Sequence, residues 1–122
     1  MHELSVCRAL IREAEAAAGR HGACAVSKLS VRVGALSGVE PTLLRNAFQA
    51  ARAGSSLEGA GLTIECVPVR VACDACGAHS DAQPNRLLCA ACGDWRTRLI
   101  SGDELTLASI ELLFDETGMQ HV

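Results

Sequence analysis

Four of the seven cysteines stand in two copies of a short motif that is typical of a metal site. The motif C-x-x-C-G occurs at residues 73–77 and again at residues 89–93. Each copy brings two thiolates onto one tight turn, and its glycine tolerates the backbone conformation that such a turn needs. Four thiolates surround one tetrahedral ion at about 2.3 Å, a geometry that zinc favours. The sequence therefore predicts a metal site with these ligands: Cys73, Cys76, Cys89 and Cys92.

This four-cysteine site is predicted to be structural, with zinc as its metal. A closed shell of four protein ligands leaves no open position for a substrate. Four thiolates would also fit a rubredoxin-like iron or an iron–sulfur cluster, but the paired spacing is that of a zinc ribbon. An odd number of cysteines argues against a closed set of disulfides. The segment holds little apolar material, so we expect metal binding to contribute on the order of 10 kcal/mol to its folding.

The second pattern with metal chemistry is the N-terminal tripeptide Met1-His2-Glu3. A histidine at position two can bind a metal together with the terminal amine and the intervening amide nitrogens. These nitrogens form fused chelate rings around a square-planar cation, the geometry that nickel(II) and copper(II) prefer. Glu3 could orient the imidazole or bind the ion directly. On this pattern alone, the polar start of a surface helix is the more common explanation.

Apolar periodicity predicts the elements that would position both patterns. Spacings of three and four indicate amphipathic helices, and strict alternation indicates half-buried strands. The last strand changes phase near Ala108 or Ser109, which predicts a bulge there. Pro68 cannot donate a ladder hydrogen bond, so we expect this part of the chain to be an edge or a crossover out of the sheet. The predicted elements are a helix over 4–21, a strand over 27–36, a helix from 41, a strand over 62–66 and a strand over 104–114.

This order predicts an α+β fold with an insertion. Two helices and a three-stranded sheet are expected to form a small α/β domain from residues 1–70 and 103–122, which contains the candidate nickel site at the N-terminus. A zinc-ribbon-like, zinc-binding domain, residues 71–102, is expected to be inserted before the last strand. Apolar residues make up 49% of the chain and charged residues 20%, which excludes a disordered protein.

Three further sets of residues have ordinary structural explanations. Cys7, Cys24 and Cys66 are expected to be small core residues. His79 is expected to be an exposed loop residue. Glu40 precedes Pro41 at the predicted start of the second helix, where a carboxylate is favourable.

Composition also excludes several function classes. The formal net charge is −3 and aromatic residues make up 2% of the chain, so neither phosphate neutralisation nor base stacking is expected. We therefore predict no nucleic-acid partner. The apolar runs are too short to span a membrane, and the first residues lack the features of a secretion signal. The expected location is the cytoplasm, without a membrane partner.

In combination, three motifs resemble the HypA/HybF family of nickel metallochaperones of hydrogenase maturation. They are MHEL at residues 1–4, RVGALSGVEP at residues 32–41 and the two C-x-x-C-G motifs, with GDEL at residues 102–105 as a further match. The resemblance implies that the N-terminal amine, His2 and the following amides bind nickel, whereas the four cysteines bind zinc. It also implies a GTPase partner, HypB, and the hydrogenase large-subunit precursor as a client.

We therefore predict a metallochaperone and not an enzyme, because no nucleophile–base pair and no glycine-rich phosphate loop is recognisable. Nickel(II) at Met1, His2 and Glu3 would be transient cargo, passed to the precursor by ligand exchange, and zinc would be resident. The alternative is a zinc-ribbon nucleic-acid-binding or protein-interaction module, which predicts a basic face. Whether the chain forms a homodimer is left open.

Overall fold

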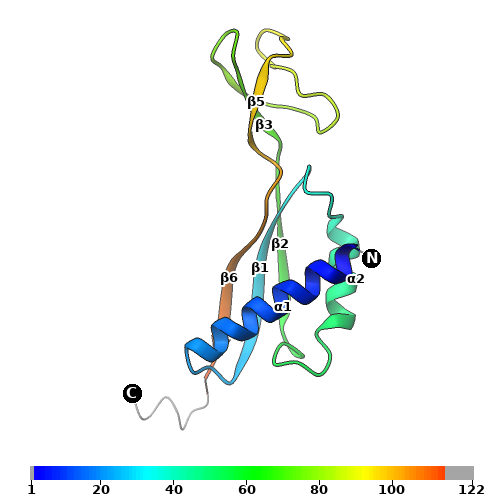
Figure 1. The fold of residues 1–122 in the computed structure, drawn as a ribbon, viewed down its shortest axis with the longest axis vertical. Coiled ribbons are helices and arrows are strands. Elements are labelled where there is room, and N and C mark those ends of the chain that lie inside the picture. Colours follow the sequence, from blue (N-terminus) through cyan, green and yellow to red (C-terminus); the bar gives the residue numbers. More distant parts are fainter. Residues whose placement is uncertain (1, 115–122) are drawn as a thin grey trace. The chain divides into compact units, whose positions relative to one another are not determined.

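The fold combines two helices with two small three-stranded sheets, as a computed structural model shows for residues 2–114 (Figure 1). Met1, the side chain of His2 and the tail 115–122 lie outside the described residues. One sheet has the strand order β2-β1-β6 and the other β4-β3-β5. No helix in the described part is long and apolar enough to cross a bilayer. The elements are α1 His2–Arg20, β1 Ala25–Gly34, α2 Pro41–Ala51, β2 Gly61–Val67, β3 Arg70–Cys73, β4 His79–Asp81, β5 Thr97–Ser101 and β6 Leu105–Leu113.

These elements confirm the predicted α+β class with two helices and a three-stranded sheet. The chain divides into two compact units. A compact unit is not yet a domain that folds alone, so the predicted boundaries at residues 71 and 102 stay a prediction. Unit 1 contains Met1–Val31, Glu40–Ile64 and Leu107–Val122, and unit 2 contains Arg32–Val39 and Glu65–Thr106.

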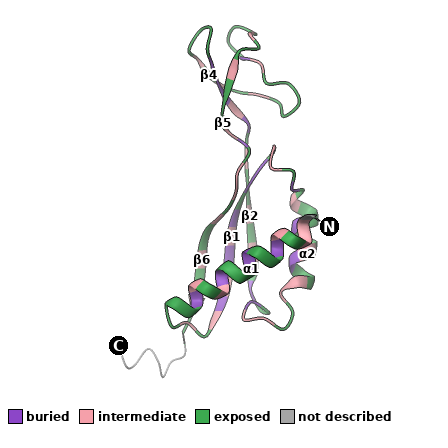
Figure 2. Ribbon diagram, viewed as in Figure 1, coloured by how far each residue is buried: buried purple, intermediate pink, exposed green. Residues whose placement is uncertain are grey.

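The core of unit 1 lies where the two helices pack on each other and on the sheet. Residues at helical spacing along α1 are buried, including Cys7 and Ile11, and so are Leu44 and Phe48 of α2. The Cys7 thiol also donates to the carbonyl of Leu44, 3.4 Å away, and so links the two helices. Figure 2 shows the same pattern, with buried residues on one side of each helix and exposed residues on the other. The predicted apolar stripes are therefore confirmed.

The start of α2 follows from two residues that suit a helix N-terminus. Pro41 occupies the first turn, where a missing N–H costs nothing. Glu40 is the N-cap residue, and its Oε2 accepts a hydrogen bond from the Leu43 amide at 2.7 Å. The favourable charge predicted for Glu40 is therefore present as a capping interaction.

Unit 2 contains the sheet β4-β3-β5, in which β3 pairs antiparallel with both neighbours. Pro68 lies between the end of β2 and the start of β3, so the predicted departure from the first sheet is confirmed. The sequence did not predict β4 and β5 as strands, because β4 has only three polar residues and β5 is mostly exposed. Such short strands carry almost no periodic signal.

A close backbone crossing between Gly34 and Gly102 lies at the base of unit 2. The Leu36 amide donates to the Gly102 carbonyl at 2.6 Å, and the Gly34 amide donates to the Glu104 carbonyl at 2.7 Å. A Cβ atom on Gly34 would overlap the Gly102 carbonyl group. Gly102 itself has φ +115°, a conformation that side chains rarely adopt. The crossing therefore requires glycine on both segments.

The final strand changes its burial phase as predicted. Leu105 and Leu107 are half-buried, and the phase then shifts by one residue at Ala108 and Ser109, which are both exposed.

Candidate metal centres

Two similar turns carry the four cysteines of the C-x-x-C-G motifs. In each turn the glycine has φ +78° and its amide donates back to the carbonyl of the first cysteine. Gly77 donates to Cys73 at 2.9 Å, and Gly93 donates to Cys89 at 2.8 Å. Cys73 is also the last residue of β3, so one ligand is positioned directly by the sheet. The turn glycines thus have the backbone role that the sequence predicts for them.

The four sulfur atoms lie together, all within 4.8 Å of one another. The two short separations, Cys73 to Cys92 and Cys76 to Cys89, are each 3.6 Å and join one turn to the other. Tetrahedral coordination with metal–sulfur bonds of about 2.3 Å requires sulfur separations of about 3.8 Å. The donor set and its spacing therefore fit a single tetrahedral ion such as zinc.

The two cysteines of each turn differ in exposure and hydrogen bonding. Cys73 and Cys89, the first of each pair, are buried, whereas Cys76 and Cys92 are exposed. The buried sulfurs accept backbone hydrogen bonds, which stabilise the charged thiolate that metal binding needs. The Cys92 amide, 3.4 Å from the Cys89 sulfur, is the main cause that lowers the pKa of the Cys89 thiol to about 6.

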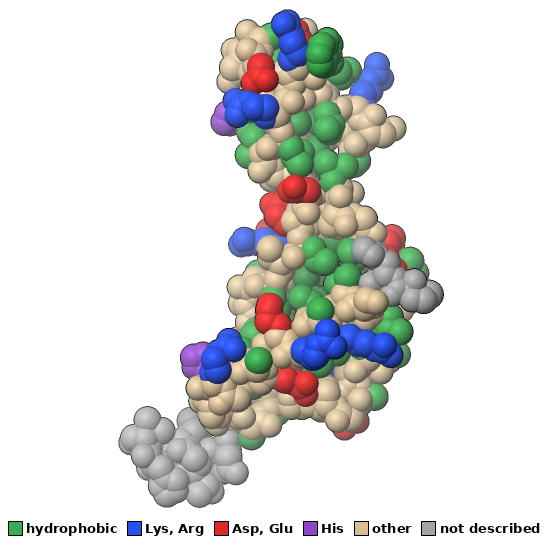
Figure 3. Space-filling model, in the orientation of Figure 1, with side chains coloured by type: hydrophobic (Ala, Val, Ile, Leu, Met, Phe, Trp, Pro, Cys, Tyr) green, Lys and Arg blue, Asp and Glu red, His purple; other side chains and the backbone are tan. Residues whose placement is uncertain are grey.

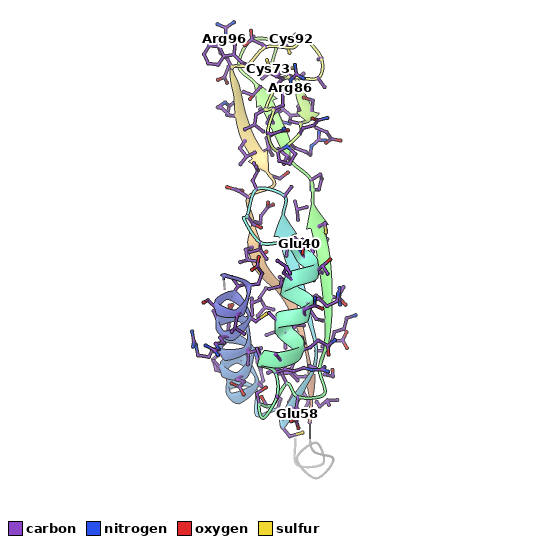
Figure 4. All side chains as sticks on the ribbon, turned by 90° about the vertical axis from the view of Figure 1, so that its right-hand side faces the viewer. Glu40, Glu58, Cys73, Arg86, Cys92 and Arg96 are labelled. Carbon is purple, nitrogen blue, oxygen red and sulfur yellow. The ribbon has the colours of Figure 1, made fainter. Side chains whose placement is uncertain are left out.

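The segment from Asp94 to Arg98 connects the two turns, and we call it the strap. Its Asp94 carbonyl accepts from the amide of Cys89 in the second turn, at 3.0 Å. Its Arg96 carbonyl accepts from the amide of Asp74 in the first turn, at 2.8 Å. Backbone hydrogen bonds from one short segment therefore fix the separation of the two cysteine pairs. Figure 4 shows Arg96 at the same end of unit 2 as Cys73 and Cys92.

Arginine–aspartate pairs hold the strap in this conformation. Arg96 donates from Nε and Nη2 to the two carboxylate oxygens of Asp94, at 3.0 and 2.8 Å. These side-chain bonds, with the Arg96 amide, lower the pKa of the Asp94 carboxyl to about 2. Arg98 donates to Asp74 at 2.7 Å. None of these four residues could be predicted from the sequence, because charge pairs across a loop leave no periodic pattern.

The N-terminal tripeptide lies at the start of α1, which begins at His2. Met1 and the His2 side chain are outside the described residues, so only Glu3 of the three is placed with its side chain. A Glu3 carboxylate oxygen accepts from the Glu40 amide at 3.3 Å. Since Glu40 also caps α2, the beginnings of the two helices are tied together. Figure 4 shows Glu40 at this end of α2.

The three remaining cysteines do not behave alike. Cys7 is buried as predicted, and burial is the main cause that raises the pKa of its thiol to about 11. The prediction that Cys24 and Cys66 are core residues is wrong, because both are exposed. Cys66 has the phase of the half-buried Ile64, but it follows the point where the chain passes into unit 2. Unit 2 contains neither helix, so no helix of its own unit covers the Cys66 side chain. Cys24 lies in the turn after α1.

Comparisons with known proteins agree on one family. A family profile described as "Hydrogenase/urease nickel incorporation, metallochaperone, hypA" matches residues 1–112. The hydrogenase maturation factor HypA of Nitrosospira multiformis is 48% identical over 113 residues, covering 93% of this chain and 98% of that protein. HypA of Aquifex aeolicus is 38% identical, covering 94% of this chain and 100% of that protein.

Solved structures give the same result for the fold. The solution structure of the Ni metallochaperone HypA from Helicobacter pylori superposes with a TM-score of 0.66 at 26% identity, covering 93% of this chain and 98% of that one. A second solution structure, of a HypA protein, superposes with a TM-score of 0.71 at 27% identity, covering 94% and 98%.

Proposed function

Since this chain belongs to the HypA family of nickel metallochaperones for hydrogenase maturation, we propose that it binds nickel(II) at its N-terminus and delivers the ion to the hydrogenase large-subunit precursor. The proposed nickel ligands are the Met1 amine, the His2 imidazole and the amide nitrogens of His2 and Glu3. The proposed zinc ligands are the four clustered cysteines. The chain would work in the cytoplasm with a GTPase of the HypB type.

The observation that carries the nickel proposal is that α1 begins at His2. The first amide groups of a helix have no hydrogen-bond partner within the helix. The amides of His2 and Glu3 can therefore give up their protons to a metal without breaking helical hydrogen bonds. The Glu3 carboxylate is held by the Glu40 amide, and this contact supports a fixed direction for the tripeptide.

Electrostatics support a site that holds nickel without trapping it. The N-terminus of a helix carries partial positive charge, which disfavours a cation. The carboxylates of Glu3 and Glu40 lie close to this end and offset that charge. A balance of this kind favours modest affinity, as a carrier that must release its cargo requires.

Unit 2 would contribute through a resident zinc ion. When bound, zinc supplies a tetrahedral cross-link between the two cysteine turns and performs no chemistry on the cargo. The strap fixes the separation of the turns, and the buried sulfurs of Cys73 and Cys89 receive backbone hydrogen bonds. This arrangement supports a structural role for unit 2 during nickel delivery.

Transfer would occur by ligand exchange. Nickel bound by nitrogen ligands would pass to thiolates or other ligands of the precursor that compete more strongly. The His2 imidazole must be unprotonated to bind metal, so lower pH weakens the nickel site and favours release.

Nickel titration of the zinc-loaded chain tests the proposal. In His2→Ala, isothermal calorimetry should show loss of the stoichiometric nickel site, while elemental analysis shows unchanged zinc. The matched control is His21→Ala, because His21 is exposed at the far end of α1 and lies outside the tripeptide.

A second variant separates the amine from the imidazole. Two residues added before Met1 convert the terminal amine into an amide, and nickel binding should fall although His2 is intact. If either variant binds nickel like the unmodified chain, the N-terminal assignment is wrong. Delivery is tested separately, by counting nickel in the purified precursor after incubation with the loaded chain.

A further inference from the structure

Exposed apolar side chains are concentrated in one short part of unit 2. Seven large hydrophobic residues are exposed in the described part of the chain, and four of them lie between Leu87 and Ile100. Trp95, the single tryptophan, is the most exposed of the seven, at 75%. Scattered exposed apolar residues are ordinary, whereas a cluster rimmed by polar residues is typical of a protein-binding site. The four residues are Leu87, Trp95, Leu99 and Ile100.

Local contacts bring these residues to one edge of the sheet. β5 is an edge strand in the order β4-β3-β5. The Thr97 hydroxyl donates to the Leu87 carbonyl at 2.7 Å, and the Thr97 amide donates to the Trp95 carbonyl at 2.9 Å. Leu99 is two residues after Thr97 on the same strand, so its side chain shares the face of Thr97. Leu87, Trp95 and Leu99 therefore lie along one face at this edge, whereas Ile100 lies at the register shift between β5 and β3 and is not part of that face.

We call this surface the β5 patch and define it as Arg86, Leu87, Trp95 and Leu99. Figure 3 shows hydrophobic side chains beside Lys or Arg side chains on unit 2, where β3 and β5 lie at the top of Figure 1. Tryptophan and arginine are the residue types that most often dominate binding energy at protein interfaces.

The charge around the patch has the opposite sign to the chain. Residues 83–101 contain three arginines and one aspartate, and Asp74 pairs with one of these arginines, so the region carries one surplus positive charge, whereas the formal net charge of the chain is −3. Arg96 and Arg98 are paired with Asp94 and Asp74. Arg86 has no side-chain hydrogen bond or ion pair within the described residues. A partner segment that carries carboxylates would supply the missing charge.

We propose that the β5 patch is the docking site for an acidic, partly apolar segment of the hydrogenase large-subunit precursor. The segment lies along the β5 edge, its apolar side chains cover Trp95 and Leu99, and its carboxylates pair with Arg86. An exposed strand edge offers backbone hydrogen bonds to such a segment. This inference rests on the client assigned under the proposed function, and it gives unit 2 a recognition role besides a structural one.

Trp95 provides a direct reporter, because the chain has no other tryptophan and no tyrosine. The zinc-loaded chain is mixed with a purified precursor variant whose tryptophans have been replaced by phenylalanine. On binding, the emission of Trp95 should shift to shorter wavelength as the ring leaves water. The complex should weaken as salt concentration rises, because exposed charge pairs are screened.

Two variants test the patch, each with a matched control in unit 1. Trp95→Ala should weaken binding of the precursor about tenfold or more, measured by calorimetry. Its control, Leu43→Ala, also removes an exposed apolar side chain and should bind normally. Arg86→Glu should weaken binding and reduce its salt dependence, whereas Arg20→Glu should not. Zinc content and far-ultraviolet circular dichroism establish that each variant is folded.

The outcomes distinguish this inference from the proposed function. If the precursor binds Trp95→Ala and Arg86→Glu as tightly as the unmodified chain, the β5 patch is not the docking site, although the client stands. If the unmodified chain does not bind the precursor, the client assignment fails and the docking inference fails with it. If Trp95→Ala instead abolishes self-association in sedimentation and leaves precursor binding intact, the patch is covered by a second copy of the chain.

Discussion

Replacing Gly34 by alanine should strongly destabilise the protein. The new Cβ would overlap the Gly102 carbonyl group and lie 2.8 Å from the amide nitrogen of Asp103. These atoms belong to the backbone, so they cannot rotate aside as a flexible side chain would. Overpacking of this kind costs about 1–3 kcal/mol. Separating the segments also weakens the hydrogen bond from Leu36 to Gly102, worth about 1 kcal/mol. We therefore expect a loss of about 3 kcal/mol in the free energy of unfolding.

A loss of this size is readily measured. One kcal/mol shifts the melting temperature of a small domain by about 4 °C or more, so Tm should fall by about 10 °C. The assay is thermal unfolding of the zinc-loaded protein, followed by circular dichroism. Gly19→Ala is the matched control, because a Cβ there has no neighbour within 4 Å and alanine favours the helix. If Gly34→Ala melts with the unmodified chain, the crossing is not as close as described.

Three further predictions concern side chains. The amide of Gly102 is the main cause that lowers the pKa of the Glu104 carboxyl in the folded protein. The Glu104 carboxylate therefore stabilises the fold at pH values above its unfolded pKa of about 4.3, and this stabilisation is lost as the pH falls through the lower folded pKa. Glu104→Gln should therefore be less stable at neutral pH and lose less stability on acidification, as urea unfolding at several pH values would show. In the zinc-loaded chain, an alkylating reagent should label Cys24 and Cys66, which are exposed, and spare Cys7, which is buried with a raised thiol pKa; mass spectrometry of peptides reads this out. The Asp94 carboxylate accepts three hydrogen bonds from Arg96, and Asp94→Asn removes its charge. Because this loosens the strap, a chelator should remove zinc faster, while nickel binding at the N-terminus is unchanged.

Features encoded locally in the sequence could be predicted. The stripe along α1, the capping residue Glu40 and the break at Pro68 each follow from a residue type at a defined spacing. The same holds for the cysteine turns, because their glycines must have positive φ. These signals involve residues a few positions apart, so they can be recognised in the sequence without knowledge of the fold.

Features that depend on distant residues could not be predicted. Glu3 meets the amide of Glu40 across 37 positions of sequence, and nothing in either neighbourhood indicates the other. Cys66 has the phase of the half-buried Ile64 but is exposed, and it belongs to unit 2, which contains neither helix. Arg96 belongs to a polar loop, and its role follows only from two contacts, its carbonyl with the Asp74 amide and its guanidinium with the Asp94 carboxylate.

The strand β3 ends at Cys73, one of the four clustered cysteines. Formation of the sheet β4-β3-β5 is therefore coupled to metal binding at that cluster. The final residue of that strand pairs with Thr97 of β5 and also supplies a sulfur to the cluster. The two outer strands, β4 and β5, have no buried residue, so we expect their pairing with β3 to depend on metal binding at the cluster. With the proposed zinc at the cluster, a shortage of zinc would affect a member of a nickel metallochaperone family through the loss of backbone pairing and not through competition for the nickel site.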